Sequence, residues 1–182
     1  SAHTNDYMLN ENPYNRIKIV FDNKKSKNYD EHDMKLINDT HKAFIRNGAS
    51  LSNQKKEELR NLDKELSLLS PQFSNNVLDA QNSFELWITD KEDLEGLSND
   101  TVEAAYEAGK NKGKEGQWLF TLQMSSYLPF MTYSKKRHLR EHLFKAYGGL
   151  CNGGKFDNSE IVKNIVKLKH KRAQLLGYKS HA

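Results

Sequence analysis

The sequence has little of several residue types that mark particular protein classes. Its 182 residues include one cysteine, Cys151, which excludes an intramolecular disulfide framework and favours a reducing compartment. No apolar run approaches the roughly 20 residues needed to cross a bilayer. Only three prolines and ten glycines are present, which is typical of a helix-rich chain rather than a disordered one. These features predict a cytoplasmic protein with no membrane partner. The periplasm stays open, because the first ten residues suggest a tag remnant joined to an internal segment.

Charge of neither sign dominates. The 28 basic and 24 acidic residues give a net charge of +4, and the two signs are interspersed, which predicts a solvated surface. The lysine-rich segment 110–118, KNKGKEGQW, could contact nucleic acid through phosphates and through stacking on Trp118. We interpret it instead as a solvated helix end followed by a turn, and expect no nucleic-acid partner.

Apolar residues at steps of three and four predict helices along most of the chain. Asn47-Gly48 is a helix stop, Ser52 an N-cap, and Asp157 with Glu160 a capping box. Pro71 is expected to kink the longest helix or split it at Ser70. That helix should pack against the one before it. The predicted helices cover 13–21, 34–45, 52–80, 98–113, 134–147 and 157–175, and 22–33 is a predicted loop.

Two short segments change to an alternating pattern with aromatic and β-branched residues. FELWIT at 84–89 and QWLFTL at 117–122 are predicted strands, paired antiparallel as a small ribbon that rests on helices. The predicted fold is therefore mainly α: one bundle-like helical lobe spanning 1–182, with a small two-stranded antiparallel β-ribbon.

The segment RHLREHLFKAY places His138 and His142 four residues apart, the spacing of a helical zinc grip. Leu139 stands where the HExxH motif has its catalytic Glu, and no third ligand is signalled. Basic side chains at 137, 140 and 145 surround the pair. Glu141 is explained by surface ion pairs with Arg137 and Lys145. We interpret the two histidines as surface residues.

Three further features could bear function. Cys151 in GGLCNGGK could be a nucleophile, but it lacks a family signature, and the glycines lack phosphate-loop spacing. His41 lies on an apolar stripe, where a packed, neutral histidine is expected. The segment 124–134 is interpreted as an apolar loop. Its part SYLPFMTYS, residues 126–134, is either core or a binding surface; core is favoured, and both remain open.

Six ordered segments together resemble the N-terminal half of the thimet oligopeptidase family of zinc metallopeptidases, most of all the bacterial peptidyl-dipeptidases (dipeptidyl carboxypeptidases). They are RNGASLS (46–52), LSPQFSNNVLDAQNSFELWITD (69–90), LEGLS (94–98), GKEGQWLFTL (113–122), SYLPFMTYSKKRHLREHLFKAY (126–147) and FDNSEIVKNIVKLKHKRAQLLGYKS (156–180). Pro71, Gly148-Gly149 and the short CNGG loop depart from the family pattern.

The resemblance implies a two-lobed helical enzyme that releases C-terminal dipeptides from short peptides. Its zinc would be held by HExxH and a downstream Glu, both absent from this sequence. Catalytic, cofactor-binding and metal residues are therefore each predicted as none here, with zinc and the catalytic half supplied by a longer enzyme. The chain would form part of the channel wall and be inactive by itself. An endo-oligopeptidase of the same family and a standalone helical peptide-binding or protein-binding module are the alternatives.

Overall fold

The computed structural model describes residues 2–182, with side chains from Asp6 onward, and divides into two compact units. The expected tag remnant lies partly outside the described residues. The first unit combines the chain up to Ser70 with Lys163–Ala182; the second is Pro71–Val162. In order, the elements are α1 (Ala2–Leu9), α2 (Glu11–Asp22), η1 (Lys24–Ser26), α3 (Glu31–Arg46), α4 (Asn53–Ser83), β1 (Leu86–Ile88), η2 (Lys91–Leu94), α5 (Asn99–Asn111), β2 (Trp118–Phe120), α6 (Met124–Tyr133), α7 (Arg137–Gly148) and α8 (Ser159–Leu175). The prediction of a mainly helical fold with one antiparallel ribbon is confirmed.

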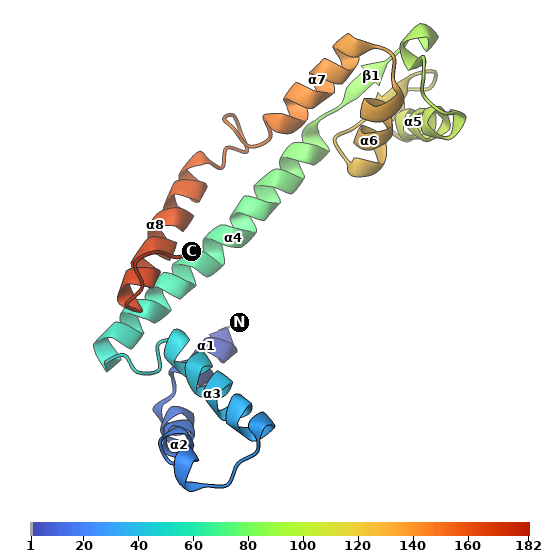
Figure 1. Ribbon diagram of the computed structural model, residues 1–182. Coiled ribbons are helices and arrows are strands. Elements are labelled where there is room, and N and C mark those ends of the chain that lie inside the picture. The colour runs from blue at the N-terminus through green and yellow to red at the C-terminus, as the bar shows by residue number, and fades with distance from the viewer. Residues whose placement is uncertain (1) are drawn as a thin grey trace. The chain divides into compact units, whose positions relative to one another are not determined.

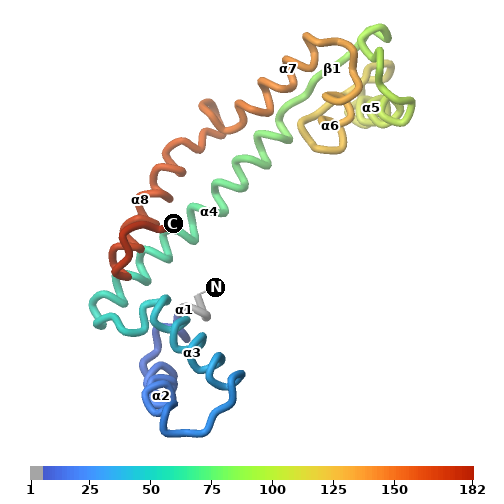
Figure 2. Tube along the Cα trace, viewed as in Figure 1, coloured from blue at the N-terminus to red at the C-terminus, as the bar shows by residue number. Residues whose placement is uncertain are grey.

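In the first unit, α2 packs beside α3 (Figures 1 and 2). The Phe44 ring, 2% exposed, meets Tyr7 and Tyr14, with ring centroids 5.6 and 6.2 Å away. Helix α3 begins at Glu31, earlier than predicted, because the Asp30 carboxylate accepts from the Asp33 N–H at 2.8 Å. In the described residues α3 packs closely on α2 and not on α4, so the prediction that α4 takes α3 as its packing partner is wrong.

The part of α4 up to Ser70 runs beside α8 (Figure 1). Arg172 and Asp63 form an ion pair at 2.6 Å between the two helices, and both side chains are largely buried. At the predicted helix stop, Gly48 has φ +90°, and a Cβ there would press against the side chains of Leu59 and Leu51. Buried side chains on these helices include Leu59, Leu62, Leu168 and Ala173.

Helix α4 continues through Pro71, so the predicted split at Ser70 is wrong. Proline removes one N–H donor and leaves the carbonyl four residues earlier, that of Ser67, without its helical partner. Ser67 is exposed, as are residues 70–75, so water can satisfy this carbonyl. The free-energy cost of Pro71 is therefore small, and the interactions of the rest of α4 outweigh it.

In the second unit, β1 and β2 pair antiparallel, as predicted, and Trp87 lies opposite Leu119. Helix α5 between them is capped by Ser98, whose hydroxyl accepts from the Thr101 N–H at 3.3 Å. Helix α5 packs closely on β2 because Gly109 carries no Cβ. A methyl group at Gly109 would overlap the main-chain carbonyl of Gln117. Because α5 approaches so closely, β2 is buried beneath it, and Phe120 of β2 is only 1% exposed.

The segment 124–134, predicted as a loop, is helix α6 up to Tyr133, so that prediction is wrong. Tertiary burial explains the helix. Phe130 is fully buried and meets Phe120 edge-to-face at 4.6 Å, while Tyr127 stacks on Tyr147 of α7. Together these contacts outweigh the cost of an internal proline, Pro129.

Two predicted caps are displaced. Ser134 ends α6 rather than capping α7, which begins at Arg137; its hydroxyl accepts from the Lys136 N–H at 3.2 Å. Helix α8 begins at Ser159, later than a cap at Asp157 would give, although the Asp157 carboxylate accepts from the Ser159 N–H at 3.0 Å. Asn158, immediately before α8, is 3% exposed and joins this region to α4.

Among residues 2–182, the structure contains no helix whose length and apolar character would let it span a membrane.

Candidate functional site

The two histidines of the suspected zinc grip lie on α7, and both side chains are exposed. The ring centroid of His142 lies 5.6 Å from that of Phe84. The predicted surface pairing of Glu141 is confirmed for Lys145, at 2.6 Å. That hydrogen bond and charge, with a smaller contribution from Arg137, lower the pKa of the Glu141 carboxyl.

The order His-x-x-Glu-His also matches the inverted form of the zinc-peptidase motif, which has its Glu next to the second histidine. In that motif, too, zinc needs a third protein ligand. Within the described part of the chain, no three His, Cys, Asp or Glu side chains lie close enough to hold a metal ion. The residues present therefore do not fit a zinc site, and the prediction that this segment carries no metal or catalytic residue stays a prediction.

Cys151 lies in the turn between α7 and α8, with an unusual φ of +57°. Its side chain is partly buried. Burial, followed by the nearby Asp157 carboxylate, raises the pKa of the thiol. A raised pKa reduces the thiolate fraction at neutral pH, the opposite of what a nucleophilic cysteine needs. The environment of Cys151 therefore suits a turn residue.

The lysine-rich segment 110–118 is engaged with the protein itself. Trp118 is buried in the core at 9% exposure, so its ring is not available to stack on a base. Lys112 pairs with Glu85 at 3.0 Å, and the Lys114 ammonium lies 4.0 Å from the centre of the Trp87 ring. These contacts fasten the end of α5 to β1.

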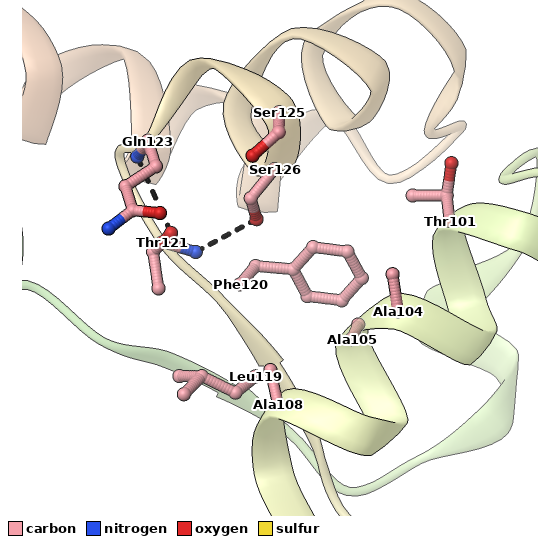
Figure 3. A pocket seen from close by; sticks show the side chains of 10 residues that line it. All are labelled: Thr101, Ala104, Ala105, Ala108, Leu119, Phe120, Thr121, Gln123, Ser125 and Ser126. Atoms are coloured by element: carbon pink, nitrogen blue, oxygen red, sulfur yellow. Dashed lines mark hydrogen bonds between the residues drawn. The ribbon is translucent and has the colours of Figure 1, made fainter. Parts of the chain in front are cut away.

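A groove of about 230 Å³ opens in the second unit between α5, β2 and the start of α6 (Figure 3). Small side chains of α5 form one wall, and the strand forms the floor. The Ser126 hydroxyl accepts from the Thr121 N–H at 3.0 Å, which fixes the α6 end of the groove. Every lining residue is uncharged: Thr101, Ala104, Ala105, Ala108, Leu119, Phe120, Thr121, Gln123, Ser125 and Ser126. Sequence patterns gave no signal for this groove, because it is assembled from segments that lie apart in the chain.

Helix α6, whose Ser125 and Ser126 line this groove, also carries exposed apolar side chains. Phe130 points into the core, whereas Met124, Leu128 and Tyr133 are 50%, 59% and 60% exposed. The core interpretation of SYLPFMTYS therefore holds for Phe130, whereas a binding surface on its exposed side chains stays a prediction. No residue of α6 is charged.

No family model matches the chain. Among curated proteins, it is 37% identical over 175 residues to Probable cytosolic oligopeptidase A of Arabidopsis thaliana, covering 93% of this chain and 25% of that protein. It is 35% identical over 173 residues to Oligopeptidase A of Haemophilus influenzae, covering 92% of this chain and 25% of that protein. It is 30% identical over 183 residues to Dipeptidyl carboxypeptidase of Salmonella typhimurium, covering 100% of this chain and 27% of that protein. The chain thus spans about a quarter of the length of these relatives.

Proposed function

Since the chain is homologous to a segment of peptidases of the thimet oligopeptidase family, as its motifs predict, we propose that it forms a non-catalytic wall of a zinc peptidase acting on short peptides. The observation that carries this proposal is the alignment of nearly the whole chain with peptidases about four times its length. The absence of HExxH from the sequence supports a wall rather than a catalytic role. A helical wall would restrict access to the metal, so that folded proteins are excluded and short peptides enter.

Cleavage within oligopeptides is the activity we favour for the longer enzyme. Identity is 35–37% with the proteins named oligopeptidase A and 30% with those named dipeptidyl carboxypeptidase. Release of C-terminal dipeptides is the second candidate, supported by alignment with a dipeptidyl carboxypeptidase over the entire chain. We place the enzyme in the cytoplasm, a proposal supported by the single cysteine and by the word cytosolic in the name of one plant relative.

A chimera tests the proposal. The chain would replace the matched segment of Haemophilus influenzae oligopeptidase A, and hydrolysis of a fluorogenic peptide would be followed with and without a zinc chelator. We expect zinc-dependent hydrolysis by the chimera and none by the 182-residue chain alone. Mass analysis of the products separates internal cleavage from release of C-terminal dipeptides.

Two results would contradict the proposal. One is a folded chimera with no activity while the parent enzyme is active under the same conditions. The other is zinc-dependent hydrolysis by the chain alone that is lost in His138→Ala, because this would make the histidine pair on α7 a metal site after all.

A further inference from the structure

Ser125 of α6 lines the groove, and the same helix exposes Met124 and Leu128; we call the groove together with these two side chains the uncharged surface. It comprises the groove residues Ala104, Ala108 and Ser125 together with Met124 and Leu128. Charged residues make up 29% of the chain, so a helix of ten residues would carry about three at that average. Helix α6 has none, and neither does the groove lining. A solvent-facing helix without charge indicates a surface that something covers.

The members of this surface are neighbours. Met124 and Leu128 are four residues apart on α6, which places their side chains one above the other on the same helix face. Ser125, which follows Met124 in the chain, lines the groove (Figure 3), so the first turn of α6 contributes both to the groove and to the exposed apolar side chains. Single exposed apolar residues are ordinary on protein surfaces, but a contiguous uncharged area of this kind is not.

The size of the groove argues against a small-molecule or substrate pocket. Such pockets measure about 300–1,000 Å³ and bury most of their ligand. At about 230 Å³ this groove is smaller, and Met124 and Leu128 on the same helix are 50% and 59% exposed. The shape suits another protein surface, with a side chain of that surface entering the groove.

We propose that the uncharged surface docks against the part of the peptidase that lies outside this chain. The inference rests on the proposed function. The relatives extend about three quarters of their length beyond the matched segment, so the longer enzyme has a large surface available for contact. Interfaces between parts of one chain can be small, because the covalent link holds the two surfaces at a high effective concentration. A second copy or a free partner would need about 1,600 Å² of total buried area, more than one helix face and a small groove provide.

Thiol accessibility tests the docking directly. Leu128→Cys would be introduced into a Cys151→Ser background, both in the isolated chain and in the oligopeptidase A chimera. Leu36→Cys, in the same background, is the matched control, because Leu36 is 67% exposed on α3 among charged neighbours. We expect the rate of maleimide labelling at position 128 to fall at least tenfold from isolated chain to chimera. The rate at position 36 should change less than twofold.

Each alternative occupant gives a distinct contrary result. Equal labelling of position 128 in chain and chimera overturns the proposal, even if the chimera is an active peptidase. Protection in the isolated chain that grows with protein concentration would instead assign the surface to a second copy. Protection of the isolated chain by a short peptide would assign it to substrate. Because labelling needs no activity, an inactive chimera that still protects position 128 would contradict the proposed function and leave the docking supported.

Discussion

Asn158 and Phe73 are joined by a hydrogen bond in which the buried side-chain amide of Asn158 donates to the main-chain carbonyl of Phe73, at 3.1 Å. The side-chain oxygen of Asn158 accepts from the Asn76 side-chain amide at 2.8 Å. The main-chain N–H of Asn158 donates to the Cys151 carbonyl at 2.9 Å. One buried residue thus fixes the turn before α8 against α4 and sets the start of α8.

Replacement of Asn158 by alanine should lower the free energy of unfolding by about 1–3 kcal/mol, because the Phe73 carbonyl and the Asn76 side chain each lose a part-buried hydrogen bond. Urea denaturation followed by circular dichroism would measure the change. Asn152→Ala is the control, since Asn152 is exposed in the same turn and should shift the midpoint little. Equal losses for the two variants would contradict the role assigned to Asn158.

Gly96 and Gly153 provide a matched pair for separating backbone strain from crowding. Their φ angles are nearly equal, at +93° and +92°. A Cβ at Gly96 would overlap the Tyr133 carbonyl at the end of α6, whereas a Cβ at Gly153 meets no atom within 4 Å. We expect Gly96→Ala to cost about 3 kcal/mol and Gly153→Ala about 1 kcal/mol, measured by denaturant unfolding. If Gly96→Ala destabilised the protein no more than Gly153→Ala, the Tyr133 carbonyl at the end of α6 would be shown to shift and make room for the methyl group.

The stability of the α2–α3 pair should depend on the protonation of His41, whose ring stacks on Phe21 with centroids 3.8 Å apart. Burial lowers the pKa of His41; Asp22 opposes this shift, while Lys18 and Lys24 add to it. A lowered pKa in the folded state means that the unfolded chain binds the proton more tightly. Stability should therefore be complete above about pH 6.5, the ordinary histidine value, and fall as the pH drops toward the lowered folded value.

His41→Phe keeps an aromatic ring at this position and removes the titrating group. Its thermal midpoint, relative to the natural sequence, should rise as the pH is lowered from 7.5 to 5. His32→Phe, which places the same ring at an exposed position on the same helix, is the matched control. Parallel pH profiles for the natural chain and His41→Phe would refute the assignment.

Alkylation of Cys151 should be slow at neutral pH. Burial and the Asp157 carboxylate both raise the thiol pKa, so the midpoint of the rate-versus-pH profile should lie above the ordinary thiol value. Asp157→Asn should move this midpoint down, because it removes the charge while keeping an acceptor oxygen. Iodoacetamide labelling followed by mass spectrometry gives the profile. A midpoint below the ordinary value would reopen the nucleophile interpretation.

Local signals in the sequence predicted much of the fold. The Ser98 cap, the Asn47-Gly48 stop and the alternating strand segments depend on neighbouring residues, and the structure places each as expected. Helix α6 was missed for a physical reason. It is apolar on more than one face and contains Pro129, so it shows no clean helical period, and the core contacts of Phe130 that stabilise it come from distant segments.

Packing partners and the groove were beyond the reach of sequence patterns for the same reason. The apolar stripe of α3 shows that a partner exists but does not identify α2 as that partner. The groove combines Ala104 and Ala108 with Ser125, residues whose individual types are unremarkable in their own segments. Only the absence of charge from 124–133 was visible beforehand, and it has meaning once these residues are known to be a helix with an exposed face.

The separation of Asn158 from Phe73 in the chain, 85 positions, also constrains the order of folding. The β1–β2 pair closes a loop about one third as long, so closing the Phe73–Asn158 loop costs about 1 kcal/mol more chain entropy. The ribbon with α5 can therefore form first, and the contacts of Asn158 close late. Loss of these contacts should then accelerate unfolding while leaving the refolding rate nearly unchanged, which makes Asn158 a determinant of how long the second unit stays folded.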